Sequence, residues 1–321
     1  MLMQRTLITG ANGFVGQALC KTLQQAGHHV IALSSKASGS ASSANEHLQC
    51  DIRDTEALAF RVAQAAPTHV VHLAAITYVP ASFENPLPTW QTNVMGSVNL
   101  LEAVRRHAPK AFMLFVSSSE VYGATFKQGS TLDENSPCQP LNPYAASKLA
   151  AEVAFAEYFR QGMPGVIARP FNHIGAQQSP DFVTSSFAKQ IALIEAGKQP
   201  PQIHVGNLEA SRDFLDVRDV CNAYRRLLEL AERPRDYPSR VNIASGRPRK
   251  IQEILDELLG MSQCHIEVIK DPARMRPSDI PFAAGNIQLL QQLTDWSPTV
   301  DLHETLADLL DHWRTLVAHS Q

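Results

Sequence analysis

The sequence predicts an α/β fold, built as a doubly wound parallel sheet with a smaller, mixed α/β lobe in its C-terminal part. Two observations on the first half of the chain predict it. Short apolar runs alternate with longer segments in which apolar residues recur at helical spacing. The runs are apolar along most of their length, as expected for strands that helices cover on both faces.

Five strands are expected before residue 170. They are RTLIT (5–9), HVIAL (29–33), HVVHLA (69–74), FMLFVS (112–117) and GVIAR (165–169). The intervening segments 14–27, 94–108 and 143–159 are rich in good helix formers. A further helix (216–231) and strand (240–245) are expected to return to the sheet, whereas the rest of the second half is more irregular.

The 321 residues are 44% hydrophobic and 18% charged, with a formal net charge of -3 and no long basic run. These values disfavour nucleic acid or an anionic membrane surface as a partner, and apolar runs such as 111–116 are too short to cross a bilayer. Five scattered cysteines without a Cys-x-x-Cys pair argue against disulfides and structural zinc, so no metal is expected. Because a strand begins at residue 5, a signal peptide has no room, and a cytoplasmic location is expected.

The stretch TGANGFVG (9–16) joins the first strand to the first helix. Its glycines, Gly10, Gly13 and Gly16, allow a tight turn and a close approach of the backbone to a pyrophosphate. The helix opening at Phe14 and Val15 offers unpaired N–H groups and a positive dipole end. A simple tight turn is the alternative, since the spacing is G-x-x-G-x-x-G. Its place in the first strand–helix unit favours a dinucleotide site in a Rossmann fold.

The end of the second strand bears on which dinucleotide binds. A carboxylate there binds the 2′-hydroxyl of NAD, but this chain has Ser34, Ser35 and Lys36. Hydroxyls and an ammonium suit a 2′-phosphate, which favours NADP(H), with NAD(H) as the alternative. The Ser-rich loop could also be only a flexible segment. Asp51, in CDIRD (50–54), either accepts a bond from the adenine amino group or caps the helix beginning near Asp54.

Tyr144 and Lys148 lie one helical turn apart on the same face of segment 143–159. A nearby ammonium favours the phenolate, so Lys148 is expected to lower the pKa of Tyr144 from its usual value of about 10. The tyrosine would then pass a proton to a substrate oxygen. Ser118 follows strand 112–117, at the edge where open sheets bind ligands, and is placed to polarise a carbonyl. A chance pairing on a helix surface is the alternative.

In chain order, TGANGFVG, CDIRD, HLAA (72–75), SSSEVYG (117–123) and YAASK (144–148) resemble the extended short-chain dehydrogenase/reductases that act on nucleotide sugars. The resemblance implies an NAD(P)H-dependent oxidoreductase whose catalytic residues are Ser118, Tyr144 and Lys148. It also implies that Lys148 binds the nicotinamide ribose and that Asn93 supports the cofactor and the proton relay. Further cofactor contacts implied by it are Asp51, Ile52, Leu73, Ala74 and Ala75.

The second half narrows the resemblance. Segments 77–86, 168–175, 181–191, 211–220 and 271–281 are similar to the GDP-4-keto-6-deoxy-mannose reductases and to the related GDP-mannose 4,6-dehydratases. In that family these segments hold the GDP and the hexose. The substrate-binding residues implied on this basis are Thr77, Ser118, Glu120, Tyr144, Asn172, Val183, Lys189, Arg212, Arg276 and Asp279.

Several of these residues also have ordinary structural interpretations. Asn172 can bond a sugar hydroxyl or a phosphate, or it can be a turn residue. The planar forks of Arg212 and Arg276 suit diphosphate oxygens, but surface salt bridges use the same groups. Lys189 could equally be a solvated helix lysine.

The resemblance implies NADPH-dependent reduction of the C4 keto group of a GDP-4-keto-6-deoxyhexose to GDP-6-deoxy-D-mannose (GDP-D-rhamnose), a donor for surface polysaccharide. The dehydratases typically have threonine where this chain has Ser118, and segments 172–183 and 271–277 look closer to the reductases. A dehydratase, for which Glu120 could be the additional acid or base, and another nucleotide-sugar epimerase or reductase are the alternatives. A non-catalytic cofactor-binding regulator is a remote one.

Residues 1–170 are expected to form the dinucleotide-binding domain, with about 211–245 returning to it. About 171–210 and 246–321 would form the lobe that binds the nucleotide sugar. Asp216 and Asp219 are expected to cap the helix that follows them.

Helical segments 94–104 and 145–156 carry apolar faces. In relatives such helices pair across a dimer, so a homodimer with a four-helix contact is expected. The GDP-sugar is the expected small-molecule partner.

Overall fold

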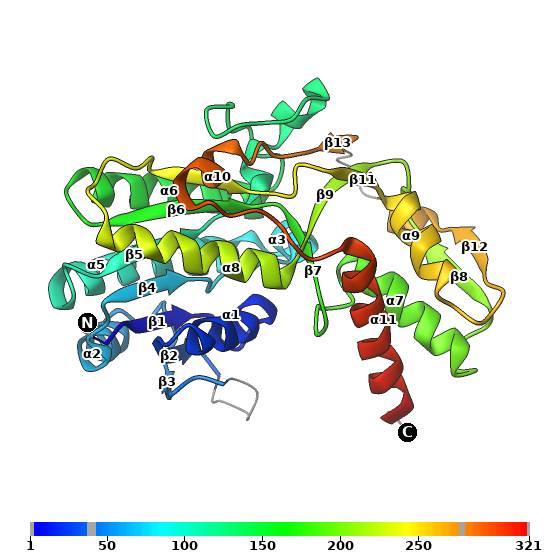
Figure 1. The fold of residues 1–321 in the computed structure, drawn as a ribbon, viewed down its shortest axis with the longest axis horizontal. Coiled ribbons are helices and arrows are strands. Elements are labelled where there is room, and N and C mark those ends of the chain that lie inside the picture. Colours follow the sequence, from blue (N-terminus) through cyan, green and yellow to red (C-terminus); the bar gives the residue numbers. More distant parts are fainter. Residues whose placement is uncertain (1–2, 37–42, 276–279, 320–321) are drawn as a thin grey trace.

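The computed structural model describes residues 3–36, 43–275 and 280–319 (Figure 1). Seven parallel strands form its main sheet in the order β10-β6-β5-β4-β1-β2-β3. The chain runs outward from β1 in one direction and then crosses over to β4, which is the order of a doubly wound dinucleotide-binding sheet. The strands are β1 (Arg5–Thr9), β2 (His29–Ser34), β3 (Glu46–Gln49), β4 (His69–His72), β5 (Phe112–Val116), β6 (Gly165–Pro170) and β10 (Arg240–Ile243).

The predicted fold class is confirmed, and six of these strands match the predicted ones with ends that differ by at most two residues. The strand that was not predicted is β3. It lies at the edge of the sheet and only Leu48 of its four residues is buried, so it lacks the continuous apolar run that marks the others.

Helices cover both faces of the sheet, which explains the apolar runs. One face packs against α1 (Phe14–Gln25) and α8 (Val217–Leu228), which Figure 1 shows in front of the sheet. The other face packs against α2 (Thr55–Ala65), α5 (Gly96–His107) and α6 (Pro143–Arg160). Consecutive strand residues therefore enter opposite cores.

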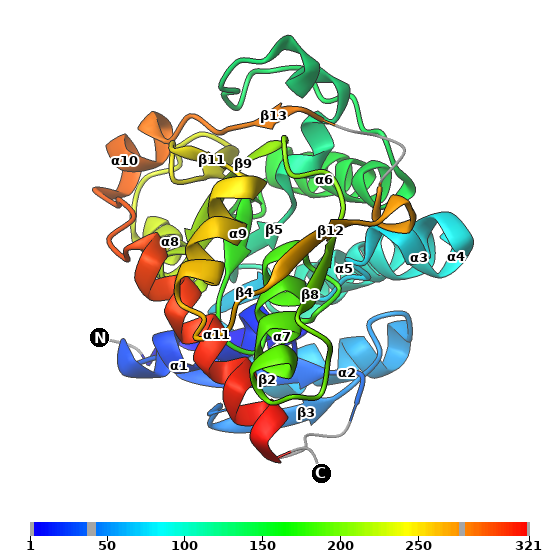
Figure 2. The same ribbon diagram turned by 90° about the vertical axis from the view of Figure 1, so that its right-hand side faces the viewer.

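A second, smaller group of elements lies to the right in Figure 1 and nearest the viewer in Figure 2. Helices α7 (Val183–Glu195), α9 (Ile251–Gly260) and α11 (Leu302–His319) share its apolar core. The strands outside the main sheet form two further sheets, one of four strands and one of two. These strands are β7 (Asn172–Ile174), β9 (Ser211–Asp216), β11 (Pro248–Lys250) and β13 (Phe282–Ala283) in the four-stranded sheet, and β8 (Gln202–Val205) and β12 (Glu267–Lys270) in the other.

Residues 211–245 were expected to return to the dinucleotide-binding domain, with a helix (216–231) and a strand (240–245) returning to the sheet. Within this stretch, residues 211–216 form β9, which pairs antiparallel to β11 and parallel to β7 and β13. Only α8 and β10 of that stretch belong with the main sheet.

The short elements connect these bodies. They are α3 (Val79–Glu84), α4 (Pro86–Trp90), the π-helical turn η1 (Gln91–Met95), η2 (Ser119–Tyr122), η3 (Ala124–Gln128), η4 (Glu229–Glu232), η5 (Pro272–Arg274) and α10 (Gln288–Thr294). None of the helices in the described ranges has the length and apolar character needed to cross a membrane. No cluster of three or more His, Cys, Asp or Glu residues in those ranges is arranged to hold a metal ion.

Candidate active site

The turn between β1 and α1 has the tight geometry that its glycines predict. Gly10 has φ +73°, a left-handed conformation that favours glycine, and its N–H donates to Leu33 O at 2.9 Å. A Cβ at Gly16 would collide with the carbonyl oxygen of Gly10, so α1 packs directly on the turn. No side chain among the described residues caps the first turn of α1, and its N–H groups and dipole remain available to an anion.

The end of β2 lies beside this turn. Asn12 Nδ2 donates to the Ser34 hydroxyl at 2.8 Å, and that hydroxyl donates to Lys36 O at 2.7 Å. Ser35 and Lys36 are exposed. Hydroxyls and an ammonium next to a helix N-terminus are groups that fit a dinucleotide phosphate. Sequence reasoning missed Asn12, although it lies inside the glycine motif.

Asp51 is not the cap of α2, which was one of its two predicted roles. Asp54 caps that helix by accepting from Ala57 N at 3.0 Å. The Asp51 carboxylate instead accepts from Arg53 Nη2 at 2.6 Å and Nε at 3.1 Å, and this hydrogen bonding lowers its pKa. Asp51 and Arg53 line a cavity of about 590 Å³ with Asp54 and Met95. The predicted contact of Asp51 with adenine stays a prediction.

The loop that follows β4 contains the half-buried Leu73, Ala74 and Ala75, and it abuts the glycine turn. A Cβ at Gly10 would lie 2.8 Å from Ala74 N. On the other side of the strand ends, Ile52 is buried and touches Gly96.

Asn93 is only 1% exposed and its amide bonds inside the protein. Its Oδ1 accepts from Ile76 N at 2.8 Å, and its Nδ2 donates to Ile76 O and to Ser147 Oγ. Asn93 thus holds the loop after β4 against α6, and its part in a proton relay stays a prediction.

The structure brings Ser118, Glu120 and Tyr144 together at the end of β5. Helix α6 starts there because Asn142 caps it, accepting from Ala145 N at 2.7 Å, and Pro143 suits the first turn. Ser118 and Glu120 both act on Tyr144: the Ser118 side chain lowers the pKa of the phenol and the Glu120 charge raises it, although burial has the largest effect. Asn142, which sequence reasoning did not single out, also donates to Glu120 Oε2 at 3.1 Å.

The expected effect of Lys148 on Tyr144 is wrong for this structure. Burial raises the pKa of Tyr144 to about 12, and Lys148 is not among the groups that shift it. The Lys148 ammonium donates to Val116 O at 2.5 Å and lies 4.5 Å from the centre of the Phe115 ring. Burial lowers the pKa of Lys148 itself to about 7, against the opposing charge of Glu152. The spacing in the sequence predicts that Tyr144 and Lys148 share a helix face, but it does not predict that Lys148 contacts Val116 and Phe115 of β5.

Three predicted substrate residues are exposed near the second group of elements. Thr77 precedes α3, Asn172 begins β7, and Val183 begins α7 with 37% exposure. Next to Asn172, His173 stacks on Phe14 with ring centres 6.1 Å apart, as a packing residue does.

Two predicted basic residues have protein partners. Lys189 Nζ lies 5.4 Å from the centre of the Trp313 ring. Arg212 Nη1 donates to Ser211 O at 2.9 Å and to Ile280 O at 2.6 Å, tying β9 to the segment before β13. Arg276 and Asp279 lie outside the described residues.

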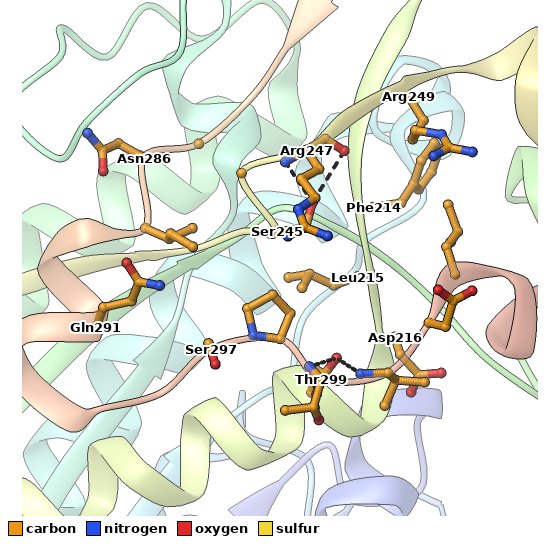
Figure 3. A pocket seen from close by; sticks show the side chains of 18 of the residues that line it. Phe214, Leu215, Asp216, Ser245, Arg247, Arg249, Asn286, Gln291, Ser297 and Thr299 are labelled. Atoms are coloured by element: carbon orange, nitrogen blue, oxygen red, sulfur yellow. Dashed lines mark hydrogen bonds between the residues drawn. The ribbon is translucent and has the colours of Figure 1, made fainter.

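A second cavity, of about 760 Å³, lies away from Tyr144, between β9, α10 and the turn after β10. Figure 3 shows Arg247 and Arg249 on one side of it and Asn286 and Gln291 on another. No predicted site residue within the described ranges lines it. At its base, Thr299 N and Oγ1 donate to the Asp219 carboxylate at 3.0–3.1 Å. Asp219 is therefore not a helix cap, whereas Asp216 is one.

Known proteins resemble the chain over almost its whole length. A family model described as GDP-mannose 4,6 dehydratase matches residues 7–309. GDP-6-deoxy-D-mannose reductase of Pseudomonas aeruginosa is 36% identical over 98% of this chain and 99% of that protein. GDP-mannose 4,6 dehydratase 1 of Arabidopsis thaliana is 28% identical over 95% of this chain and 88% of that protein.

A solved structure also resembles this protein over almost its whole length. The structure of RMD from Pseudomonas aeruginosa complexed with NADPH superposes with a TM-score of 0.84, at 33% identity, and covers 98% of this chain and 100% of that one. Both the sequence match and this superposition agree with the predicted resemblance to extended nucleotide-sugar enzymes. The chain belongs to the GDP-mannose 4,6-dehydratase family.

Proposed function

We propose that the protein is an NADPH-dependent oxidoreductase that reduces the C4 keto group of a GDP-4-keto-6-deoxyhexose to GDP-6-deoxy-D-mannose (GDP-D-rhamnose). The observation that carries the proposal is the 36% identity to GDP-6-deoxy-D-mannose reductase over 98% of this chain and 99% of that protein. The grouping of Ser118 and Tyr144 at the ligand-binding edge of the sheet supports it. The product is proposed to be a cytoplasmic donor for surface polysaccharide.

The chain's own residues handle the substrate oxygen and the proton, while bound NADPH supplies the hydride. The Tyr144 hydroxyl gives its proton to the C4 oxygen, and its raised pKa of about 12 keeps that proton in place at neutral pH until it is needed. The Ser118 hydroxyl, which lies close enough to Tyr144 to lower the pKa of the phenol, orients the same oxygen. Lys148, fixed by Val116 O, binds the nicotinamide ribose.

The cofactor residues proposed are those around the glycine turn. Gly10, Gly13, Gly16 and the opening of α1 hold the pyrophosphate. Ser34, Ser35 and Lys36 hold the 2′-phosphate, which favours NADP(H) over NAD(H). Phe14, Val15, Asp51, Ile52, Leu73, Ala74, Ala75 and Asn93 complete the proposed set.

Reduction is favoured over dehydration although the family model carries the dehydratase description. The dehydratase compared above is 28% identical, against 36% for the reductase. The dehydratases also typically have threonine where this chain has Ser118, and segments 172–183 and 271–277 look closer to the reductases.

The substrate set is proposed on resemblance together with position. Exposed Thr77, Asn172 and Val183 offer contacts to the hexose or the GDP. Lys189 and Arg212 offer cations to the diphosphate. Glu120, Arg276 and Asp279 complete the proposed set.

We also propose a homodimer that pairs α5 and α6 with the same helices of a second copy. Val153 on α6 is 66% exposed and Met95, just before α5, is 55% exposed. Large apolar side chains that face solvent on neighbouring elements are typical of an interface. The proposed domains are residues 1–170 with about 211–245, and about 171–210 and 246–321 as the substrate lobe.

The test incubates the purified protein with GDP-4-keto-6-deoxy-mannose and NADPH, follows absorbance at 340 nm and identifies the product by NMR. Oxidation of NADPH with formation of GDP-6-deoxy-D-mannose is expected. Tyr144→Phe is expected to lose most of kcat, while its Kd for NADPH stays within about twofold. Conversion of GDP-mannose without added NADPH to the 4-keto-6-deoxy product would instead identify a dehydratase.

A further inference from the structure

A buried chain of hydrogen bonds begins at His72, the last residue of β4, which the proposed reaction does not use. It is 1% exposed, and its ring packs beside the stacked rings of Phe115 and Phe155, at centroid distances of 5.8 and 5.9 Å. His72 Nδ1 lies 2.6 Å from Thr9 Oγ1, and Nε2 lies 2.9 Å from Ser97 Oγ. Both ring nitrogens therefore have a hydroxyl partner.

The surrounding bonds fix the direction of each proton. The Ser97 hydroxyl donates to Asn93 O at 2.6 Å, so toward His72 it can only accept, and Nε2 must carry the ring proton. Thr9 Oγ1 accepts from Ala74 N at 3.2 Å and gives its own proton to the bare Nδ1. The neutral tautomer of His72 that is protonated at Nε2 therefore satisfies all the hydrogen bonds from Thr9 to Ser97. Burial and the Lys148 charge lower the pKa of His72 to about 3, which keeps it in that form.

This series of hydrogen bonds holds the loop after β4 at both of its ends. Thr9 fixes Ala74 N at one end of the loop, and Asn93 bonds both backbone groups of Ile76 at the other. Asn93 Nδ2 also donates to Ser147 Oγ at 2.9 Å, and Ser147 donates to Tyr144 O at 2.7 Å. The loop is thereby connected to the helix that carries Tyr144.

The same loop sets the position of the glycine turn. Gly10 has φ +73° and no room for a Cβ, because that atom would lie 2.8 Å from Ala74 N. A shift of the loop at Ala74 must therefore move the glycine turn or open a gap beside it. The loop 73–76 therefore contacts the glycine turn and is also connected to the helix that carries Tyr144.

We propose that neutral His72 is a positioning residue, which acts through Thr9 and Ser97 to keep the loop 73–76 in register with the glycine turn and with Tyr144. This inference rests on the proposed function only in taking the glycine turn as the dinucleotide site. His72 touches neither substrate nor cofactor in this scheme. Its loss is expected to weaken dinucleotide binding and turnover, and to spare binding of the nucleotide sugar.

The test compares His72→Phe, which keeps a ring of similar size, with His72→Gln, which keeps one donor and one acceptor. His69→Phe is the matched control, because His69 is a buried histidine of the same strand and its Nδ1 lies 2.9 Å from the hydroxyl of the adjacent Thr68. The Kd for NADPH is measured by fluorescence titration without sugar, and kcat and both KM values are measured by absorbance. All assays run well below the Tm of each variant.

His72→Phe is expected to raise the NADPH Kd about tenfold and lower kcat about tenfold, because buried hydroxyls lose their partner. KM for the sugar nucleotide should stay within about twofold, His72→Gln should recover most of the loss, and His69→Phe should bind NADPH like the parent protein. If His72→Phe does not fold, Ser97→Ala breaks the same chain at its next bond and should weaken NADPH binding about threefold.

An unchanged NADPH Kd and kcat in His72→Phe would overturn the inference, as would an equal loss in His69→Phe. An unchanged NADPH Kd in Ser97→Ala would overturn it where His72→Phe cannot be made. The outcome is separable from that of the proposed function: a parent protein that binds NADPH but leaves the 4-keto sugar unreduced would refute the reaction and not the positioning role. A parent protein that binds no dinucleotide would refute both.

Discussion

Removal of one partner from the buried Arg169–Glu152 pair should destabilise the protein strongly. Arg169 on β6 donates from Nε at 2.9 Å and from Nη2 at 2.6 Å to the two carboxylate oxygens of Glu152 on α6. Their side chains are 1% and 5% exposed. The guanidinium carbon also lies 4.8 Å from the centre of the Tyr122 ring. The pair therefore joins the sheet to the helix that carries Tyr144, in a place that water does not reach.

The size of the effect follows from burial. Arg169→Met leaves the Glu152 carboxylate without its counter-ion, at an expected cost of about 3–5 kcal/mol. A typical domain has a free energy of unfolding of about 5–15 kcal/mol, so the loss is a large share of the total. Glu152→Leu should cost a similar amount, because it leaves the guanidinium unpaired. The double variant removes both charges and should cost less than either single one.

Urea unfolding followed by far-UV circular dichroism measures all four proteins. The double-mutant cycle should give a large negative coupling energy, and the m values of the four proteins should be similar. Single variants that lose less than about 1 kcal/mol would refute it, because the pair would then behave like a surface salt bridge. Costs that simply add in the double variant would refute it as well.

Three further outcomes are expected. Lowering the pH from 7.5 to 5.0 should reduce the free energy of unfolding by about 2 kcal/mol for each of His69 and His72. Burial lowers their pKa values to about 4 and about 3, so below pH 6.5 the unfolded protein takes up protons that the folded protein does not. Urea unfolding of His72→Phe should show a smaller loss of stability over the same pH range. Val153→Glu should halve the mass measured by light scattering, and a parent protein that is already monomeric would contradict the dimer. Lys36→Ala should reduce the ratio of NADPH to NADH affinity about tenfold, and an unchanged ratio would place the 2′-phosphate elsewhere.

The main sheet could be predicted because burial on both faces leaves a mark in the local sequence. Each strand with two covered faces is a continuous apolar run, and the glycine turn identifies the first strand–helix unit. The edge strand β3 has a single buried residue and leaves no such mark. Strand β9 (residues 211–216) was not predicted either, because its pairing depends on β7, β11 and β13, which are distant in sequence or too short to recognise.

The shared helix face of Tyr144 and Lys148 could be predicted, whereas the electrostatic environment of the two side chains could not. Helical spacing places Tyr144 and Lys148 on one face, and the structure agrees. Whether the ammonium acts on the phenol depends on what else surrounds it, and Val116 O and the Phe115 ring come from β5. In the same way, the sequence left Asp51 as either an adenine contact or the cap of the helix beginning near Asp54, and only the structure shows that Asp54 itself is the cap.

Helix α6 links these observations, because Tyr144, Lys148 and Glu152 lie at intervals of four residues on one buried face. Glu152 raises the pKa of Lys148 against the larger effect of burial, and Arg169 neutralises Glu152. A change at Arg169 therefore alters the charge that Glu152 presents to Lys148. Glu152 lies two helical turns from Tyr144. If Arg169→Met folds, its unpaired carboxylate should hold the Lys148 ammonium more firmly protonated, and any limb of the pH–rate profile that reports Lys148 should move to higher pH. A profile that keeps its midpoints while stability falls would separate the structural role of the pair from an electrostatic one.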